Sequence, residues 1–441
     1  MTITMSQGTV HCKLAGRDEI NVSRLFGELS MAHKEICDWP VDRIIDIIDE
    51  FAINLLDREN EIHRIYPNSG IPFIANWCKK SNLEALLDSS LGDRYCLDRF
   101  VDSNVRLDRA YMAFPCGTVV HWMAGNVPTL SFLSLLQGML TKNVNVIKLS
   151  SSSDDLLFKL LEQISCIKKG EHQNGYELVQ SVAVIRYDHS RKDISDVISR
   201  GADARVIWGD DKSVEVIKAL PAKLGVRDVV FSNKTSFIAI GKCILESVDI
   251  QKIAKKIATD ISIFEQKACA SPHTIFIETD NDSELVSFAE YLKECLQSIL
   301  KVMPKTMPSQ NEVSAILNLR AQYDMYHRAW YSEGTEFTIL SDDYIQLGPP
   351  VGNRTIYLRK IDRLERLAEL ITPKVQTVGM VASYERYEGL TALFGARGVQ
   401  RFTQVGAMTN FEIPWDGCYL PQHIVRWSSR FKHNNTEKYL S

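Results

Sequence analysis

Cys269 is the residue whose type and position most directly allow covalent chemistry. It follows a predicted helix over 250–263 and precedes a short apolar run over 273–277 that is typical of a buried strand. A thiol between two rigid elements can face a cleft, and cysteine attacks acyl carbons to form a covalent intermediate. Free cysteines are also common as small buried apolar residues, and the chain has 10 cysteines, so both roles stay open.

Two other polar residues follow predicted strands at positions that suit ligand binding. Asn126 lies in a turn after the apolar run 119–123, where its amide either stabilises an oxyanion or caps the next helix. Lys148 ends the next predicted strand and is followed by the serines Ser150 and Ser151. A lysine with hydroxyl donors before a helix suits a phosphate or a ribose, although a solvated lysine with an N-cap serine has the same pattern.

Alternating strands and helices must position these residues. After a helical start over 17–102, apolar runs alternate with helical patterns from residue 117 onward. The predicted strands are 119–123, 144–148, 182–187, 205–208, 237–240, 273–277 and 355–358. Strands separated by helices form βαβ units and mostly parallel sheets, which bind ligands beyond the carboxyl ends of their strands. The pattern therefore predicts two consecutive α/β domains.

Composition restricts the class of protein. A chain of 441 residues is too long for one small core, and a net charge of -4 gives no reason to expect nucleic-acid binding. No apolar run approaches the ~20 residues of a membrane span, and no cysteine or histidine spacing indicates zinc. The first ten residues lack the blocks of a signal peptide, so reduced thiols and a cytoplasmic location are expected.

Seven segments, taken in order, resemble the aldehyde dehydrogenase superfamily. They are Gly117–Trp122, Gly125–Pro128, Asn143–Ser150, Val206–Val216, Phe264–Pro272, Val375–Gly379 and Ile424–Trp427. The last three are most similar to the acyl-CoA reductase branch, LuxC-like, which is typified by the bioluminescence fatty-acid reductase. The resemblance covers residues 117–427 and is weak before residue 110.

The resemblance implies a fold. The expected architecture is α/β and aldehyde dehydrogenase-like, with a Rossmann-like cofactor domain, a catalytic domain, both built on parallel sheets, and a small oligomerisation element. The expected segments are 1–110 (helical, packing on the cofactor domain), 111–235 (NADP-binding), 236–412 (catalytic) and 413–441 (tail with an oligomerisation strand).

The resemblance also implies residue roles. Cys269 corresponds to the nucleophile, and Asn126 corresponds to the side chain that donates to the oxyanion. The positions that correspond to cofactor contacts are Lys148, Ser150, Ser151, Gly209 and Gly348. Gly348 begins a Gly-Pro-Pro turn that is also common as an ordinary loop.

Departures from the superfamily sharpen the expected chemistry. Hydrolytic members carry a glutamate base where this chain has Val230 or Phe231, so a thioacyl enzyme here is expected to hydrolyse slowly. Ser151 replaces an acidic residue near the ribose lysine, which favours a 2′-phosphate and therefore NADPH. Glu265 precedes Cys269 and stays unassigned, whereas His273 begins a strand and is expected to be a core or boundary histidine.

The expected function is NADPH-dependent reduction of an acyl thioester, most simply a long-chain fatty acyl-CoA, to the aldehyde through a thioacyl-Cys269 intermediate. The expected partners are an acyl-CoA or acyl-carrier substrate, an acyl-protein synthetase or acyltransferase and further copies of the chain. No metal, nucleic acid or membrane span is expected. The alternatives are an acyltransferase or thioesterase that uses Cys269 without reduction, and a non-catalytic subunit of an acyl-transfer complex.

Overall fold

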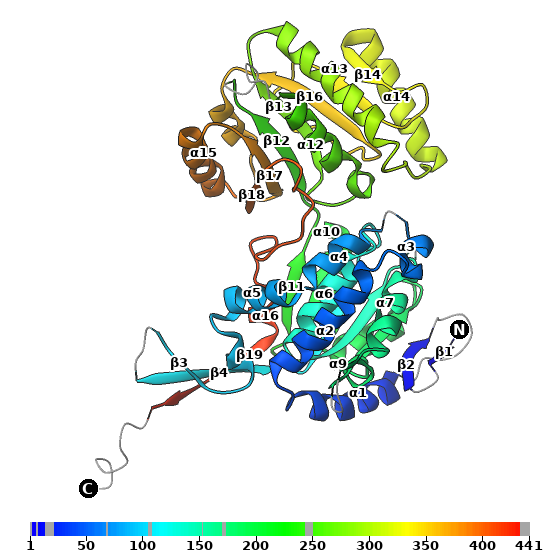
Figure 1. Cartoon of the computed structure of the whole chain (residues 1–441), viewed down its shortest axis with the longest axis vertical. Helices are drawn as coiled ribbons and strands as arrows, with labels where there is room; N and C mark the ends of the chain where they lie inside the picture. Colours follow the sequence, from blue (N-terminus) through cyan, green and yellow to red (C-terminus); the bar gives the residue numbers. More distant parts are fainter. Residues whose placement is uncertain are drawn as a thin grey trace. The chain divides into compact units, whose positions relative to one another are not determined.

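The chain folds into two compact units, each with its own parallel sheet (Figure 1). Unit 1 comprises residues 1–232 together with 418–441, and unit 2 comprises residues 233–417. This computed structural model describes residues 2–5, 8–13, 22–67, 69–104, 108–151, 153–169, 173–242 and 250–432. The finer division of the chain into four segments stays a prediction.

The main sheet of unit 1 is parallel, with strand order β11-β10-β5-β6-β9. Its strands are β5 (Thr118–Trp122), β6 (Val144–Leu149), β9 (Val182–Arg186), β10 (Ala204–Trp208) and β11 (Arg227–Phe231). After β5, the chain adds β6 and β9 in turn on one side of β5, and it then adds β10 and β11 on the other side. The strand order therefore reverses between β5 and β10, and such a switch point is where open α/β sheets bind ligands.

Helices cover both faces of strands β5, β6, β9 and β10, so almost all residues of these four strands are buried. Apolar residues of α1 and α9 pack on the face formed by Val120 and Trp122 of β5. On the other face lies α6, whose residues 131–140 are all buried, and α2 and α7 pack around α6. The helices of unit 1 are α1 (Val22–Ile36), α2 (Val41–Leu56), α3 (Glu61–Ile65), α4 (Ile71–Trp77), α5 (Lys80–Leu91), η1 (Arg94–Leu97), α6 (Leu130–Leu140), α7 (Leu156–Ser165), α8 (Gly175–Val179), α9 (Lys192–Gly201), α10 (Asp211–Lys218) and α16 (Leu420–His423).

A buried hydrogen-bond network ties α6 to the central strands. His121 of β5 contacts Ser134 Oγ through Nδ1 (2.8 Å) and Asn145 Oδ1 through Nε2 (3.1 Å). Trp208 Nε1 of β10 donates to the same Ser134 Oγ (3.0 Å). Burial lowers the pKa of His121 to about 4, so its imidazole is neutral at neutral pH. The network holds β5, β6 and β10 in register beneath the turns that follow them.

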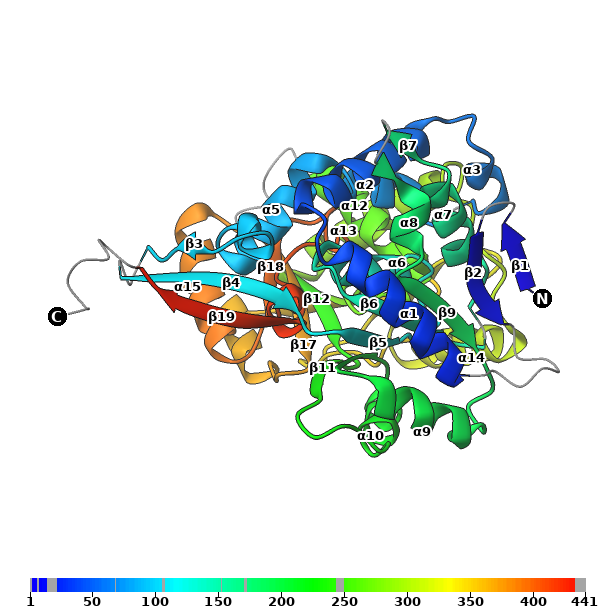
Figure 2. The ribbon, with the colours of Figure 1, turned by 90° about the horizontal axis from the view of Figure 1, so that it is seen from below.

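Smaller antiparallel elements complete unit 1. Figures 1 and 2 show β4 and β19 running side by side as a ribbon, and β3 pairs with the other edge of β4. These strands are β1 (Thr2–Met5), β2 (Gly8–Lys13), β3 (Val101–Asp102), β4 (Arg109–Pro115), β7 (Lys168–Lys169), β8 (Gln173–Asn174) and β19 (Val425–Phe431). The pairing brings the end of the described chain back to β4, more than 300 residues earlier in sequence, at Val425 and Pro115.

The sheet of unit 2 has the order β14-β15-β16-β13-β12-β17-β18, and all its pairs are parallel except β14 with β15. Its strands are β12 (Thr235–Ile240), β13 (Pro272–Glu278), β14 (Arg328–Tyr331), β15 (Thr338–Ser341), β16 (Thr355–Ile361), β17 (Val375–Val381) and β18 (Arg401–Thr403). Every residue of β13 is buried, as expected for a strand that is covered on both faces.

Alternating residues of β12 face different helices. Ile238 and Ile240 pack with α12 and α13, whereas Phe237 and Ala239 pack with η3 and α15. The helices of unit 2 are α12 (Ile250–Ser262), η2 (Ile263–Gln266), α13 (Asp282–Ile299), α14 (Gln310–Tyr326), η3 (Leu364–Glu369) and α15 (Tyr384–Ala396). The two clusters enclose β12 and β13 and so fix the position of the connection that holds Cys269, just before β13.

All seven strands predicted from the sequence are confirmed, with boundaries that differ by at most two or three residues. One helix begins earlier than its periodicity indicates. The pattern over 213–220 predicts a start at Ser213, whereas α10 begins at Asp211 because Asp210 Oδ1 accepts from Ser213 N (2.7 Å) and caps the helix.

Candidate active site

Cys269 lies in unit 2, in the connection between η2 and β13, at the amino edge of the sheet. Its carbonyl oxygen accepts a hydrogen bond from Ser236 Oγ of β12 (2.7 Å). The same hydroxyl accepts from Thr377 N of β17 (3.2 Å). The backbone of Cys269 is therefore tied to two neighbouring strands, and its side chain is half-buried.

The residues just before Cys269 adopt an unusual backbone. Phe264, Glu265 and Gln266 all have positive φ angles, of 53°, 53° and 59°. Non-glycine residues pay for this conformation, so it persists only where surrounding contacts enforce it. Two of these enforcing contacts are hydrogen bonds that Gln266 Nε2 donates to the carbonyls of Pro272 (2.8 Å) and Thr355 (3.1 Å). Backbone strain of this kind is concentrated at functional sites.

A buried ion pair provides the remaining restraint. Arg354 donates hydrogen bonds to the Glu265 carboxylate from Nε (2.8 Å) and Nη2 (2.9 Å), and both side chains are almost fully buried. The backbone N–H of Asn353 donates to the Glu265 carbonyl (2.9 Å), and that of Thr306 donates to the carboxylate (3.2 Å). Glu265, which sequence reasoning left unassigned, is thus a structural clamp on the Cys269 loop. Its carboxylate is committed to these partners.

The electrostatic surroundings of Cys269 favour a neutral thiol. Burial, followed by the charge of Asp416, raises the pKa of Cys269, while the backbone N–H groups of Lys234 and Cys269 and the Lys234 ammonium oppose the rise. The thiolate is the nucleophile in acyl transfer, so a proton acceptor is needed. Sequence reasoning did not select Asp416 or Lys234, because no local pattern connects them with Cys269.

Two other predicted features of unit 2 have structural explanations. His273 is buried at the start of β13, and burial lowers its pKa to about 4, so it is a core histidine. The N–H of Gly348 donates to Thr274 Oγ1 (3.0 Å), and a Cβ at Gly348 would lie 2.1 Å from a carbon of the Tyr357 ring. Close packing therefore requires glycine at this position, and a role for Gly348 in cofactor binding stays a prediction.

In unit 1 three predicted residues share the carboxyl edge of one sheet. Asn126 follows β5, Lys148 lies near the end of β6 and Gly209 follows β10. Asn126 and Gly209 thus flank the switch point, where a ligand is expected. Ser151 is exposed and lies two residues after the end of β6, and Ser150 stands between them.

Lys148 has a defined position at this edge. Its side chain is half-buried, with Nζ 5.1 Å from the centroid of the Tyr187 ring. Burial lowers the pKa of Lys148, and the nearby Asp188 carboxylate opposes this change. Asp188 follows β9, the neighbour of β6, and it was not selected from the sequence. A carboxylate is therefore present near Lys148 even though Ser151 replaces the expected acidic residue.

The turn at Gly209 is tight, but the helix that follows is acidic at its start. A Cβ at Gly209 would lie 3.1 Å from Ser213 Cβ, and its N–H donates to the Phe231 carbonyl (3.2 Å). Asp210 already caps α10, and Asp211 adds a second negative charge there. A helix N-terminus favours anions when its charge is uncompensated. We therefore do not expect α10 to bind a diphosphate, although Gly209 leaves room for close approach of a ligand.

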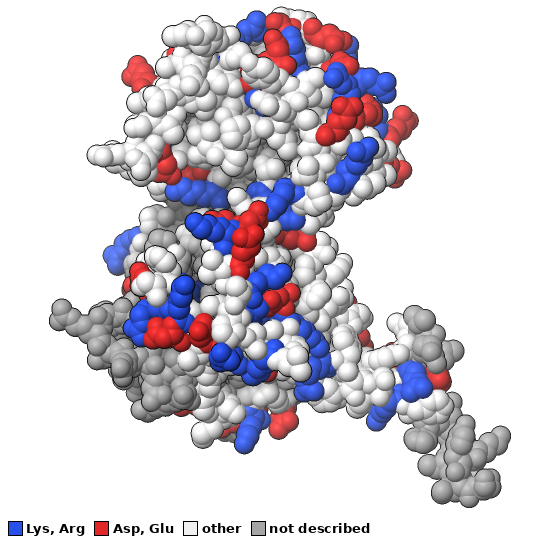
Figure 3. Space-filling model, turned by 180° about the vertical axis from the view of Figure 1, so that it is seen from behind, with Lys and Arg blue, Asp and Glu red and all other residues white. Residues whose placement is uncertain are grey.

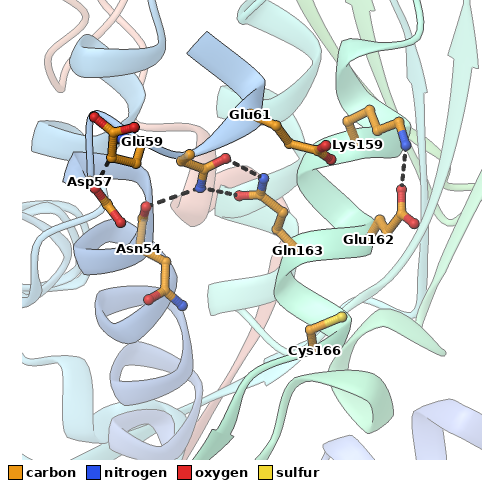
Figure 4. A pocket seen from close by; sticks show the side chains of 9 residues that line it. Asn54, Asp57, Glu59, Glu61, Lys159, Glu162, Gln163 and Cys166 are labelled. Carbon is orange, nitrogen blue, oxygen red and sulfur yellow. Dashed lines mark hydrogen bonds and ion pairs between the residues drawn. The ribbon is translucent and has the colours of Figure 1, made fainter. Parts of the chain in front are cut away.

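A pocket elsewhere in unit 1 contains none of the predicted site residues. Figure 4 shows it between α2, α3 and α7, where Asn60 and Gln163 exchange hydrogen bonds through their side-chain amides. It is lined by Asn54, Asp57, Glu59, Asn60, Glu61, Lys159, Glu162, Gln163 and Cys166.

The described residues contain no group of three or more histidine, cysteine, aspartate or glutamate side chains arranged to hold a metal ion. Within the same ranges, no helix is both long and apolar enough to cross a bilayer. On the face drawn in Figure 3, positive and negative side chains are interspersed without a field of a single sign. Such a surface gives no sign of a nucleic-acid interface.

Solved structures similar to this chain define its fold class. The NADP-dependent glyceraldehyde-3-phosphate dehydrogenase of Bacillus halodurans C-125, complexed with NADP, has a TM-score of 0.67 at 14% identity, covering 93% of this chain and 90% of its own. An indole-3-acetaldehyde dehydrogenase complexed with NAD+ has a TM-score of 0.69 at 13% identity, covering 93% and 88%. The fold is that of the aldehyde dehydrogenases, as the sequence resemblance implied.

Residues 36–427 match the family described as acyl-CoA reductase (LuxC), and the chain belongs to that family. Among curated relatives, a long-chain acyl-protein thioester reductase of Photorhabdus luminescens is 29% identical over 380 residues, covering 80% of this chain and 72% of the relative. A long-chain acyl-protein thioester reductase of Vibrio harveyi is 24% identical over 432 residues, covering 93% of this chain and 87% of the relative.

Proposed function

We propose that the protein reduces a long-chain acyl thioester to the aldehyde, with Cys269 as the acyl-accepting nucleophile. The observation that carries this proposal is Cys269 itself, held by a strained and clamped loop in a member of the acyl-CoA reductase family. The relatives named above are long-chain acyl-protein thioester reductases, which supports a fatty acyl substrate. The donor thiol is either coenzyme A or a carrier or partner protein.

The residues of the chain have separate roles in this reaction. The Cys269 sulfur attacks the acyl carbonyl, and the Asn126 amide and the Cys269 N–H donate to the oxyanion that forms. The donor thiol then leaves and the acyl group stays on Cys269. Val230 and Phe231 stand where hydrolytic members of the superfamily carry a glutamate base, and neither can activate water, which slows hydrolysis of the thioacyl group before its reduction. A bound NADPH supplies the hydride for that reduction.

The first sheet offers groups that fit a dinucleotide. Lys148 beside Tyr187 suits the adenosine ribose, with Ser150 and Ser151 following, and Gly209 allows close backbone approach. We propose NADPH as the cofactor because Lys148 attracts a 2′-phosphate. Asp188 opposes this preference, since its charge lies near the same lysine.

Asp188→Asn is therefore expected to increase the preference for NADPH over NADH by roughly 3- to 10-fold, because it removes a charge that repels the 2′-phosphate. The measurement is the ratio of kcat/KM for the two cofactors at low and high salt. Asp196→Asn, on α9, is the control and should leave the ratio unchanged. An unchanged ratio in Asp188→Asn would place the 2′-phosphate away from Lys148.

Asn126→Ala is expected to lower kcat by ~10²-fold or more, because an oxyanion donor acts mainly in the transition state. KM and cofactor affinity should change little. Steady-state kinetics and NADPH fluorescence titration measure both. If kcat is unchanged and only thermal stability falls, Asn126 serves as a turn residue alone.

A homo-oligomer, a cytoplasmic location and an acyl-donating partner enzyme complete the proposal. Trp427 and Phe431 of β19 remain substantially exposed, at 47% and 43%, on a strand whose only partner in the described part of the chain is β4. Such a strand suits pairing with another copy of the chain. Sedimentation of the purified protein with and without residues 424–441 tests this assembly.

The reaction is tested by mixing the protein with acyl-CoAs of graded length and NADPH, and following the loss of nicotinamide absorbance together with the aldehyde formed. Length-dependent formation of aldehyde supports the proposal. Release of free acid or acyl transfer without loss of NADPH would instead indicate a thioesterase or an acyltransferase. Absence of both reactions, also with acyl-carrier donors, would favour a non-catalytic subunit.

A further inference from the structure

Cys269 needs a proton acceptor, and the structure offers one carboxylate in its electrostatic surroundings. Glu265 is committed to Arg354, and His273 is a buried neutral histidine. Asp416 and Lys234 are the charged side chains with the largest effects on the pKa of Cys269. Lys234 donates to the Pro373 carbonyl (2.9 Å) and carries positive charge, so of these two Asp416 is the proton acceptor.

Asp416 is held firmly in place. It has a positive φ of 50° and is followed by Gly417 at 68°, so two consecutive left-handed residues turn the chain there. The preceding Trp415 is buried and stacks on Phe411 with ring centroids 4.6 Å apart. Gln376 Nε2 donates to Asp416 Oδ1. These contacts fix the carboxylate against the amino end of β17.

The same strand end is connected to Cys269. Gln376 is adjacent to Thr377, whose N–H donates to Ser236 Oγ, and that hydroxyl donates to the Cys269 carbonyl (2.7 Å). Cys269 and Asp416, which are 147 residues apart, are thus brought together at one edge of the sheet of unit 2 by β12 and β17. Lys234 lies two residues before Ser236 and completes the cluster.

Two buried oxygens beside Asp416 still have acceptor capacity. Gln376 Oε1 and Gln400 Oε1 have no hydrogen-bond partner among the described residues. Gln400 packs against Gly417, and its N–H donates to the Gln376 carbonyl (3.2 Å). Buried polar atoms of this kind are normally satisfied by water or by a ligand. A water molecule is therefore expected to contact them beside the Asp416 carboxylate.

We propose that Asp416 accepts the Cys269 proton during acyl transfer and returns it to the departing thiol. This inference rests on the proposed nucleophilic role of Cys269. The S–H bond of Cys269 breaks as its S–C bond to the acyl group forms, and the proton passes through one water to the carboxylate. The bond between the acyl carbon and the donor sulfur then breaks, and the donor thiolate takes the proton from Asp416. Protons and electrons balance without another reactant.

Burial raises the pKa of Asp416, while the Gln376 hydrogen bond and Lys234 oppose the rise. A carboxyl group with a raised pKa is a better base near neutral pH than an ordinary one. The Asp416 charge also disfavours the Cys269 thiolate. Removing that charge should therefore have two opposite effects, with more thiolate at a given pH and slower acyl transfer.

Asp416→Asn tests the proposal because it keeps the shape of the side chain. Acylation of Cys269 by hexadecanoyl-CoA without NADPH, followed by intact-protein mass, should slow by ~10²-fold or more. Alkylation of the Cys269 peptide by iodoacetamide should shift its pH profile to lower pH. Unchanged or faster acylation would overturn the proposal, as would an unshifted alkylation profile. A purely structural role would slow both reactions without moving the profile.

Two further variants keep the test decisive. If Asp416→Asn does not fold, Asp416→Glu retains the charge and displaces the carboxylate, so acylation should slow while the alkylation profile stays in place. Wild-type acylation in that variant would also overturn the proposal. Asp362→Asn, beyond the carboxyl end of β16, is the matched control and should alter neither measurement. If Cys269→Ala still forms an acyl-enzyme, the proposed function is wrong. If Cys269→Ala is inactive but Asp416→Asn behaves as wild type, Cys269 remains the nucleophile and the proposed role of Asp416 is wrong.

Discussion

Cys269→Ala is expected to abolish aldehyde formation, with a loss of at least ~10⁴-fold in kcat, because removing a covalent nucleophile eliminates the step that all later steps need. NADPH binding should persist, since four of the five predicted cofactor residues (Lys148, Ser150, Ser151 and Gly209) belong to unit 1, whereas Cys269 belongs to unit 2. The measurements are aldehyde formation from acyl-CoA, acyl-enzyme mass and fluorescence titration with NADPH.

Cys295→Ala is the matched control for this variant. Cys295 is another half-buried thiol of unit 2, on α13, and burial raises its pKa as it does that of Cys269. The two thiols differ in their surroundings, because only Cys269 follows the strained and clamped segment 264–266. The control should keep wild-type turnover. Turnover that survives in Cys269→Ala but not in Cys295→Ala would reverse the assignment.

Arg354→Ala is expected to lower the free energy of unfolding by ~3–5 kcal/mol, because it leaves the Glu265 carboxylate buried without its partner. The Arg354 side chain is 1% exposed and that of Glu265 is 10% exposed, so water cannot replace the lost contacts readily. Urea unfolding followed by tryptophan fluorescence and circular dichroism measures this change. The transition of unit 2 must be resolved from that of unit 1, since two units need not unfold together.

The control for this prediction is an exposed ion pair in the same unit. Arg366 contacts Asp362, four residues earlier in the sequence, at 2.6 Å, and both side chains are nearly half exposed. Arg366→Ala should cost less than ~1 kcal/mol, as exposed pairs typically do. Arg354→Lys should recover only part of the stability, because lysine keeps the charge but cannot form the bidentate contact. Equal losses in Arg354→Ala and Arg366→Ala would show that Glu265 is not held as described.

The Arg354 variants also bear on catalysis. The ion pair restrains Glu265 in a left-handed conformation four residues before Cys269. Releasing that strain should let the loop relax, so the Arg354→Lys enzyme should lose turnover even at temperatures where it is fully folded. The clamp thus links the stability of unit 2 to the position of the nucleophile.

The sequence by itself determined the elements and the principal candidates. Apolar runs separated by helical periodicity predicted four of the five strands in the main sheet of unit 1 and three of the seven in the sheet of unit 2. These patterns are local properties of the sequence, and burial on both faces of a strand imposes them. Residue type and position relative to those strands also singled out Cys269, Asn126 and Lys148. Parallel strands deliver the residues after their carboxyl ends to one edge, so Asn126 and Lys148 could be expected on the same edge without knowledge of the strand order.

Only the tertiary structure decided what surrounds these residues. Glu265 binds Arg354, which lies 89 residues later in the sequence, and Asp416 lies at the same sheet edge as Cys269, 147 residues earlier. Both neighbourhoods arise because strands distant in sequence pair in one sheet. Asp188 reaches Lys148 because β9 lies beside β6. No local pattern encodes such neighbours, since they follow from strand order and from the packing of helices on each face. The same packing removes water from the Cys269 thiol and raises its pKa. The tertiary structure therefore keeps the thiol protonated, and the proton must be removed before Cys269 can act as a nucleophile.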